Sequence, residues 1–142
     1  MRYSFTSKIL TELFKPVTME TPEGSVEDPP LVESAFSGRV IAVHYSGLLS
    51  QARLNYFKPS LFGILTGNTQ QIVIDLEEVH GVSQSTLGVL VDFAAAVLGR
   101  GKKMYLFSPP TDLLNILDNL QLGCFFEILP AEEDVINILP DE

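Results

Sequence analysis

A strand followed by a helix and a second strand constrains the fold of this chain more than any other feature. Residues 70–76 read QQIVIDL, a short continuous apolar run typical of a strand buried on both faces. Residues 85–101, STLGVLVDFAAAVLGRG, are rich in Ala, Leu and Val and are stopped by glycines, which predicts a helix. Residues 102–108, KKMYLFS, form another strand-like run. This order favours parallel strands joined by a crossover helix.

The same alternation continues on both sides of this unit. Two strand-like runs, LVESAF and RVIAVHYSG, come before it, and Ser37 and Gly38 between them predict a hairpin turn. Residues 49–67 carry apolar side chains at helical spacing, with Pro59 expected to kink or split the helix. TDLLNILDNLQLG and AEEDVINIL predict two later helices, with the short strand CFFEIL before the second. We predict an α/β fold with a mostly parallel central β-sheet, crossover helices and an N-terminal strand hairpin.

The first 30 residues differ from the rest of the chain. Residues 1–15 place apolar side chains along one helical stripe. Residues 16–30, PVTMETPEGSVEDPP, contain four prolines and four acids, a composition typical of a linker or mobile loop. We therefore predict an N-terminal helix and linker over residues 1–30, and a compact domain over residues 31–142.

Charge and cysteine content exclude several classes of function. The formal net charge of -9 disfavours contact with nucleic acid or anionic lipid. The chain has no apolar stretch long enough to span a membrane, and residues 1–14 make a poor signal peptide. Cys124 is the single cysteine, so no intramolecular disulfide forms, and we expect it to pack as a buried apolar side chain. These features predict a soluble, cytoplasmic protein.

Histidines are the first candidates for catalysis or metal binding. His44 lies in an alternating strand and is expected to be structural or exposed. His80 follows the central strand, where α/β sheets place ligands. No cysteine or carboxylate lies at a ligand-like spacing from His80, and the chain has no P-loop or G-x-S-x-G motif. We expect no metal and no cofactor; a hydrolase that pairs His80 with Ser85 is the least favoured alternative.

Three hydroxyl residues crowd the start of the helix after the central strand. Ser83, Ser85 and Thr86 lie where backbone N–H groups have no helical partner. One of them suffices to cap the helix. A phosphate at this position would meet the free N–H groups and the positive end of the helix dipole. Capping alone and regulated phosphorylation are therefore both open.

Over residues 31–140 the chain resembles the STAS-domain family of bacterial anti-sigma-factor antagonists. The matching motifs, in order, are Gly47–Leu49, Ile72–Val79, Ser83–Leu90, Gly101–Leu106 and Leu117–Phe126. The family signature D-S/T-S/T-G-L-G-x-L aligns with residues 83–90, SQSTLGVL. Ser83 therefore takes the place of the acid, Gln84 that of the first hydroxyl residue, and Thr86 that of the glycine.

The resemblance implies a STAS fold, no enzymatic activity and partner switching. In this mechanism the antagonist binds an anti-sigma factor, often a serine kinase, and phosphorylation breaks the complex; a phosphatase can reverse it. The implied phosphorylation site is Ser85. The oligomeric state of the protein stays open, with a homodimer as one alternative. A role as an unphosphorylated subunit or scaffold of a transport, lipid-trafficking or other signalling assembly also stays open. The implied partner-binding residues are Ser83, Gln84, Ser85, Thr86, Leu87 and His80.

Overall fold

A computed structural model describes residues 15–20, 32–37, 39–49, 54–66, 69–123 and 126–139. Residues 1–14, which make up most of the predicted N-terminal helix, lie outside these ranges, and so does Cys124. In the described ranges no helix combines the length and the apolar character that crossing a membrane requires.

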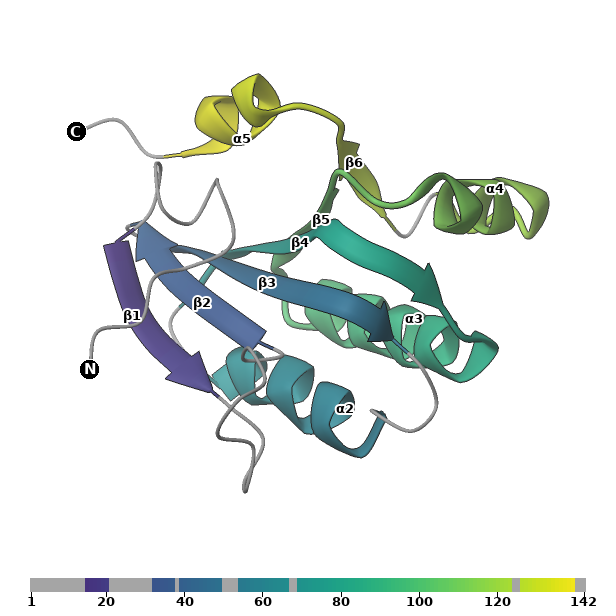
Figure 1. Cartoon of the computed structure of the whole chain (residues 1–142). Coiled ribbons are helices and arrows are strands. Elements are labelled where there is room, and N and C mark those ends of the chain that lie inside the picture. Colours follow the sequence, from purple (N-terminus) through teal and green to yellow (C-terminus); the bar gives the residue numbers. More distant parts are fainter. Residues whose placement is uncertain are drawn as a thin grey trace.

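Six strands form one sheet in the order β1-β2-β3-β4-β5-β6 (Figure 1). The pairs β1–β2 and β2–β3 are antiparallel, and β3, β4, β5 and β6 run parallel to one another. The predicted hairpin and mostly parallel sheet are thus confirmed. The strands are β1 (Lys15–Glu20), β2 (Val32–Ser37), β3 (Val40–Leu49), β4 (Gln71–Val82), β5 (Lys103–Phe107) and β6 (Glu127–Leu129).

Strand β1 occupies part of the segment that the composition predicted as a linker. Residues 16–20 pair with β2 at the edge of the sheet, so the linker prediction is wrong for them. An edge strand tolerates proline, which lacks a backbone N–H, because only one side of the strand needs partners. The register shifts between Pro16 and Thr18, as expected where the proline interrupts the pairing. Pro16 therefore belongs to an edge strand.

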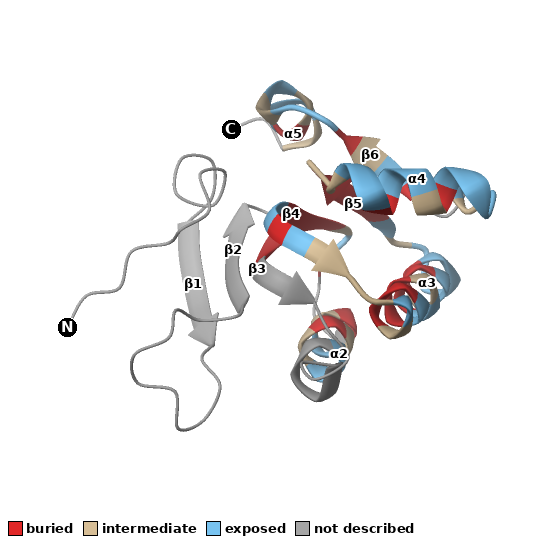
Figure 2. Ribbon diagram, turned by 45° about the vertical axis from the view of Figure 1, so that its right-hand side comes forward, coloured by how far each residue is buried: buried red, intermediate tan, exposed pale blue. Residues whose placement is uncertain are grey.

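The helices cover both faces of the sheet. They are α2 (Leu54–Phe62), the 3-10 helix η2 (Gly63–Thr66), α3 (Gln84–Gly99), α4 (Thr111–Asn119) and α5 (Glu132–Ile138). Apolar residues of α2, α3 and α4 pack with Ile72 and Ile74 on one face. Val135 of α5 packs with Val73 on the other. Figure 2 shows the buried residues of α2 and α3 turned inward. Residues 72–76 are buried on both faces, as their continuous apolar run predicted.

Two helix irregularities were anticipated from the sequence. Pro59 lies inside α2, which ends three residues later at Phe62 and tightens into η2. Helix α3 ends at Gly99, and Gly101 adopts a φ of 71° in the turn to β5. Its N–H donates to the Leu98 carbonyl, and the Lys102 N–H donates to that of Val97. A glycine at this φ closes the helix without steric cost and returns the chain to the sheet.

Candidate functional site

Strand β4 delivers the chain to the start of α3, where Ser83 is the N-cap. Its backbone is extended, with φ -75° and ψ 163°. The Ser83 Oγ accepts a hydrogen bond from the Thr86 N–H at 3.1 Å. A second hydrogen bond joins the Ser83 and Thr86 hydroxyls at 2.9 Å. This pair satisfies one of the N–H groups that every helix start leaves unpaired.

The three hydroxyls at the helix start have different roles. Thr86 is 1% exposed, and its hydroxyl is held by Ser83. Ser85 is partly exposed in the first turn, and its side chain makes no hydrogen bond to another described residue. The predicted cap is therefore confirmed, and it uses Ser83 and Thr86. Ser85 is the one hydroxyl of the three that the capping structure does not use.

The electrostatics of this helix start favour an anion. The first turn of α3 contains no acidic residue, so no side chain of that turn neutralises the positive end of the dipole. The backbone N–H groups of Gln84 and Ser85 have no partner within the helix at these positions. The Ser85 side chain lies in this turn, so a phosphate attached to it would reach these groups.

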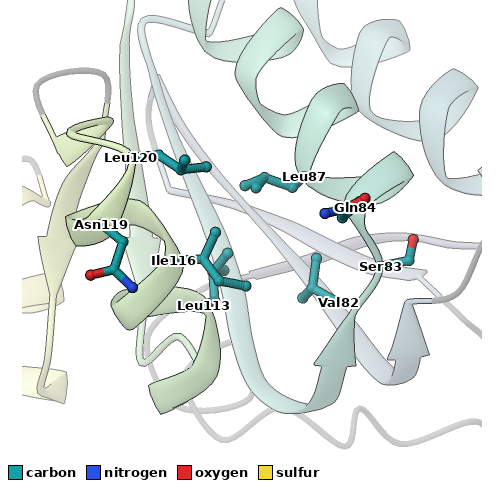
Figure 3. A pocket seen from close by; sticks show the side chains of 8 residues that line it. All are labelled: Val82, Ser83, Gln84, Leu87, Leu113, Ile116, Asn119 and Leu120. Carbon is teal, nitrogen blue, oxygen red and sulfur yellow. The ribbon is translucent and has the colours of Figure 1, made fainter.

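A pocket of about 280 Å³ opens beside the same helix start, between α3 and α4 (Figure 3). Its polar rim consists of Ser83, Gln84 and Asn119. Its apolar lining consists of Val82, Leu87, Leu113, Ile116 and Leu120. Gln84 and Leu87 line the pocket from α3; Gln84 is exposed and Leu87 is buried. The sequence predicted Gln84 and Leu87 as partner-binding residues. It predicted the helix α4 but not its place in this pocket, because nothing in the sequence places α4 next to the start of α3.

His80 does not join this site. It lies inside β4, which extends to Val82, and not after the strand as predicted. Strand β4 is longer than its apolar run because two register shifts keep it paired with β3 as far as Val82. The His80 side chain is exposed, and no hydrogen bond joins it to Ser83 or Ser85, all three of which are described. Among these described residues, His80 therefore forms no hydroxyl–imidazole pair of the kind that a hydrolase needs.

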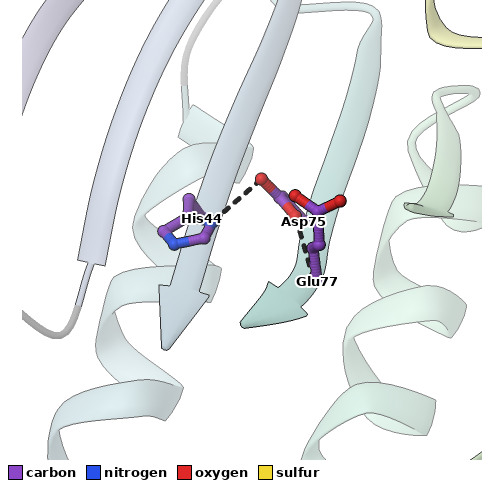
Figure 4. Close-up of polar contacts among 3 residues, drawn as sticks. All are labelled: His44, Asp75 and Glu77. Atoms are coloured by element: carbon purple, nitrogen blue, oxygen red, sulfur yellow. Dashed lines mark hydrogen bonds and ion pairs between the residues drawn. The ribbon is translucent and has the colours of Figure 1, made fainter. Parts of the chain in front are cut away.

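His44 is structural. Its Nδ1 lies 2.8 Å from the Asp75 Oδ2, between β3 and β4 (Figure 4). Both side chains are buried. Among the residues that the structure describes, no group of three or more His, Cys, Asp and Glu side chains is placed to hold a metal ion.

Comparison with known proteins decides the family. The sequence model described as "STAS domain" matches residues 32–135. The chain belongs to the STAS family. No curated protein sequence matches this chain.

Solved structures share this STAS fold. A protein of Thermotoga maritima described as an anti-sigma factor antagonist has a TM-score of 0.69 at 18% identity, covering 76% of this chain and 93% of its own. An anti-sigma factor antagonist from Mycobacterium paratuberculosis has a TM-score of 0.65 at 16% identity, covering 78% and 93%. The phosphorylated form of the Bacillus cell fate determinant SpoIIAA has a TM-score of 0.62 at 13% identity, covering 75% and 98%.

The cap geometry explains one departure from the STAS signature. Ser83 stands where the signature has an acid, and both residue types make good N-caps. The substitution therefore preserves the start of α3 while it removes a negative charge next to Ser85.

Proposed function

We propose that this STAS protein is a regulatory protein-binding module that acts as an anti-sigma-factor antagonist. It binds a serine-kinase-type anti-sigma factor through the surface formed by the start of α3 and the pocket beside it. The observation that carries this proposal is that the three hydroxyls have different contacts. Ser83 and Thr86 cap the helix, whereas the Ser85 hydroxyl is partly exposed and takes no part in the cap. The structural neighbours described as antagonists support the same role.

Phosphorylation of Ser85 would control this binding. A phosphate adds about -1.5 to -2 charges at neutral pH. The first turn of α3, which has no acid, tolerates that charge within the fold. A partner docked over the helix start would have to bury the same charge, at a large desolvation cost. The phosphorylated form would release its partner, and a phosphatase would restore binding.

One observation favours a second candidate, a constitutive STAS scaffold in a transport, lipid-trafficking or other signalling assembly. Gln84 is exposed at the first helical position, where the family signature has a hydroxyl residue. Glutamine cannot accept a phosphate, and Ser85 in the next position is only partly exposed. In this candidate the α3 surface binds its partner without a switch.

Mass spectrometry and partner capture separate the two candidates. We expect phosphate on Ser85 in protein isolated from its own cells, and a captured kinase-type anti-sigma factor. Ser85→Asp should reduce capture about tenfold or more, since it places a charge in the interface, and Ser85→Ala should retain it. Asn137→Asp is the matched control, because it adds the same charge on α5. Absence of phosphate together with unchanged capture by Ser85→Asp would favour the scaffold.

A further inference from the structure

The outer face of α3 is unusual for a helix in contact with solvent. Asp92 is the only charged residue among its sixteen. Its other exposed positions are Gln84, Gly88, Ala95, Leu98 and Gly99. Surface helices ordinarily carry several charged side chains on the outer face, and these residues leave it largely apolar.

Helix α4 extends this apolar surface. Ile116 and Leu120 line the pocket from the α4 side, and Leu120 is 57% exposed. Gln84 and Leu87 line it from α3, so the pocket joins the outer face of α3 to one side of α4. An exposed leucine at the mouth of an apolar pocket is a feature of interaction surfaces.

Charge is distributed unevenly along the molecule. The pocket is built from residues 82–87 and 113–120, and the chain contains no lysine or arginine within residues 71–99 or 104–123. The same segments contain six acids: Asp75, Glu77, Glu78, Asp92, Asp112 and Asp118. Arg39, Arg100, Lys102 and Lys103 lie at the opposite end of the strands, where β3 and β5 begin and α3 ends. Lys58 lies on α2.

Two of these acids lie on or beside the apolar surface. Asp112 precedes Ile116 by four residues on α4, so both lie on one side of that helix. Asp92 follows Gly88 by four residues and therefore lies on the exposed side of α3. An apolar surface that carries exposed carboxylates is complementary to an apolar side chain accompanied by cations.

We propose that the pocket and the outer face of α3 bind a basic amphipathic helix of the protein partner. An apolar side chain of that helix fills the pocket, and its lysines or arginines lie near Asp92 and Asp112. This inference rests on the proposed function and specifies the chemistry of the partner. The pocket volume of about 280 Å³ is large enough to admit an apolar side chain.

Charge also argues against a second copy of this chain as the occupant. Two copies facing each other through this surface would bring together segments that carry acids and no basic residues. Like-charge contact of this kind opposes association. A basic partner gains from the same field, which also speeds its approach.

A designed peptide tests the chemistry directly. The probe is a fluorescent peptide of leucine and lysine with leucine at i, i+3, i+4 and i+7, and its counterpart has glutamate in place of every lysine. We expect fluorescence anisotropy to show binding of the lysine peptide, weakening with salt. The glutamate peptide should bind at least about tenfold more weakly. Equal binding of the two peptides, or binding of neither, would overturn the proposal.

Matched variants on α4 locate the binding surface. Leu120→Gln changes a residue that lines the pocket, and Asp112→Asn changes an acid on the same side of α4 as the lining residue Ile116. Leu114→Gln and Asp118→Asn change exposed residues that neither line the pocket nor share that side of the helix. We expect the first pair to weaken peptide binding about fivefold each and the second pair to change it less than about twofold. Equal effects of the two pairs would contradict the proposed site.

The remaining outcomes separate this inference from the proposed function. Analytical ultracentrifugation tests the second copy. Dimers that Leu120→Gln breaks and Leu114→Gln leaves intact would assign the pocket to a second copy and overturn the inference. Failure of the peptide alone would leave the Ser85 variants and the capture experiment as an independent test of the switch. If the Ser85 variants show no switch but the lysine peptide still binds specifically, the inference about the basic helix stands. The protein would then be a constitutive binding module.

Discussion

The Nδ1 atom of His44 lies 2.8 Å from the Oδ2 atom of Asp75, and this hydrogen bond joins β3 to β4 inside the protein. The two side chains are 1% and 0% exposed. The other carboxyl oxygen of Asp75, Oδ1, accepts the backbone N–H of Glu77 at 3.0 Å. The β3–β4 ladder shifts register just after His44 and Asp75. Asp75 thus supplies an acceptor at the point where the regular ladder is interrupted.

Removing this carboxyl group should destabilise the fold strongly. We expect Asp75→Ala to lower the free energy of unfolding by about 3 kcal/mol or more, because it leaves the His44 ring and the Glu77 N–H without their acceptor. Urea unfolding followed by circular dichroism measures the change. Glu78→Ala, an exposed change in the same strand, should stay within about 0.5 kcal/mol. Similar values for the two variants would contradict a structural role for the pair.

Capping by Ser83 has a smaller and separable effect. Ser83→Ala should cost about 1 kcal/mol, since it removes the acceptor for the Thr86 N–H. Ser83→Asp should recover the loss, because aspartate caps equally well and its charge suits the helix dipole. Ser85→Ala should change the free energy of unfolding by less than about 0.5 kcal/mol. A full cap-sized loss at Ser85 would show that its hydroxyl is structural and would weaken the switch proposal.

The spacing of apolar residues predicted those helices and strands whose buried side chains follow a regular pattern along the chain. The run over residues 72–76 became the central strand, and Ser83 with the Ala-rich segment became a capped helix, because local pattern and tertiary burial agree there. The same patterns implied a parallel sheet with crossover helices. From β2 to α5, the order and type of elements therefore followed from the sequence.

Contacts between distant segments did not follow from the sequence. His44 and Asp75 are 31 residues apart, and only the β3–β4 register brings them together. The pocket depends on how α4 packs beside the start of α3, which no local pattern specifies. β1 was missed because proline and acids at a sheet edge resemble those of a loop. Of the residues that the sequence analysis expects to bind a partner, Ser83, Gln84 and Leu87 line the pocket.

The aromatic contact between α2 and α3 provides a test of core packing. The rings of Phe62 and Phe93 lie edge to face, with centroids 5.5 Å apart. Phe93 is completely buried, so Phe93→Ala should lower the free energy of unfolding by about 3–5 kcal/mol. Leu98→Ala, on the same helix and 55% exposed, should cost less than about 1 kcal/mol. Comparable losses for the two variants in urea unfolding would contradict the assignment of the α3 inner and outer faces.

The Tyr105 phenol should make stability depend on alkaline pH. Burial, and next the negative charge of Glu127, raise the pKa of Tyr105 above the ordinary tyrosine value of 10.0. Its hydroxyl donates to the Gln71 Oε1 at 2.7 Å. Below pH 10 the phenol is neutral in both the folded and the unfolded chain. Above pH 10 the unfolded chain loses this proton first, so the contribution of Tyr105 to stability falls as the pH rises through the folded-state pKa.

Comparison with Tyr105→Phe isolates this effect from the other tyrosines. At pH 8 we expect the variant to be less stable by about 1 kcal/mol, because it lacks the hydrogen bond to Gln71. Between pH 10 and more alkaline conditions the difference should shrink, since the variant has no phenol to ionise at this position. Phe107→Leu, a buried change in the same strand, should show a constant difference over that range. A gap between wild type and Tyr105→Phe that widened with pH would mean that the folded protein favours the ionised phenol, opposite to the direction that burial and Glu127 impose.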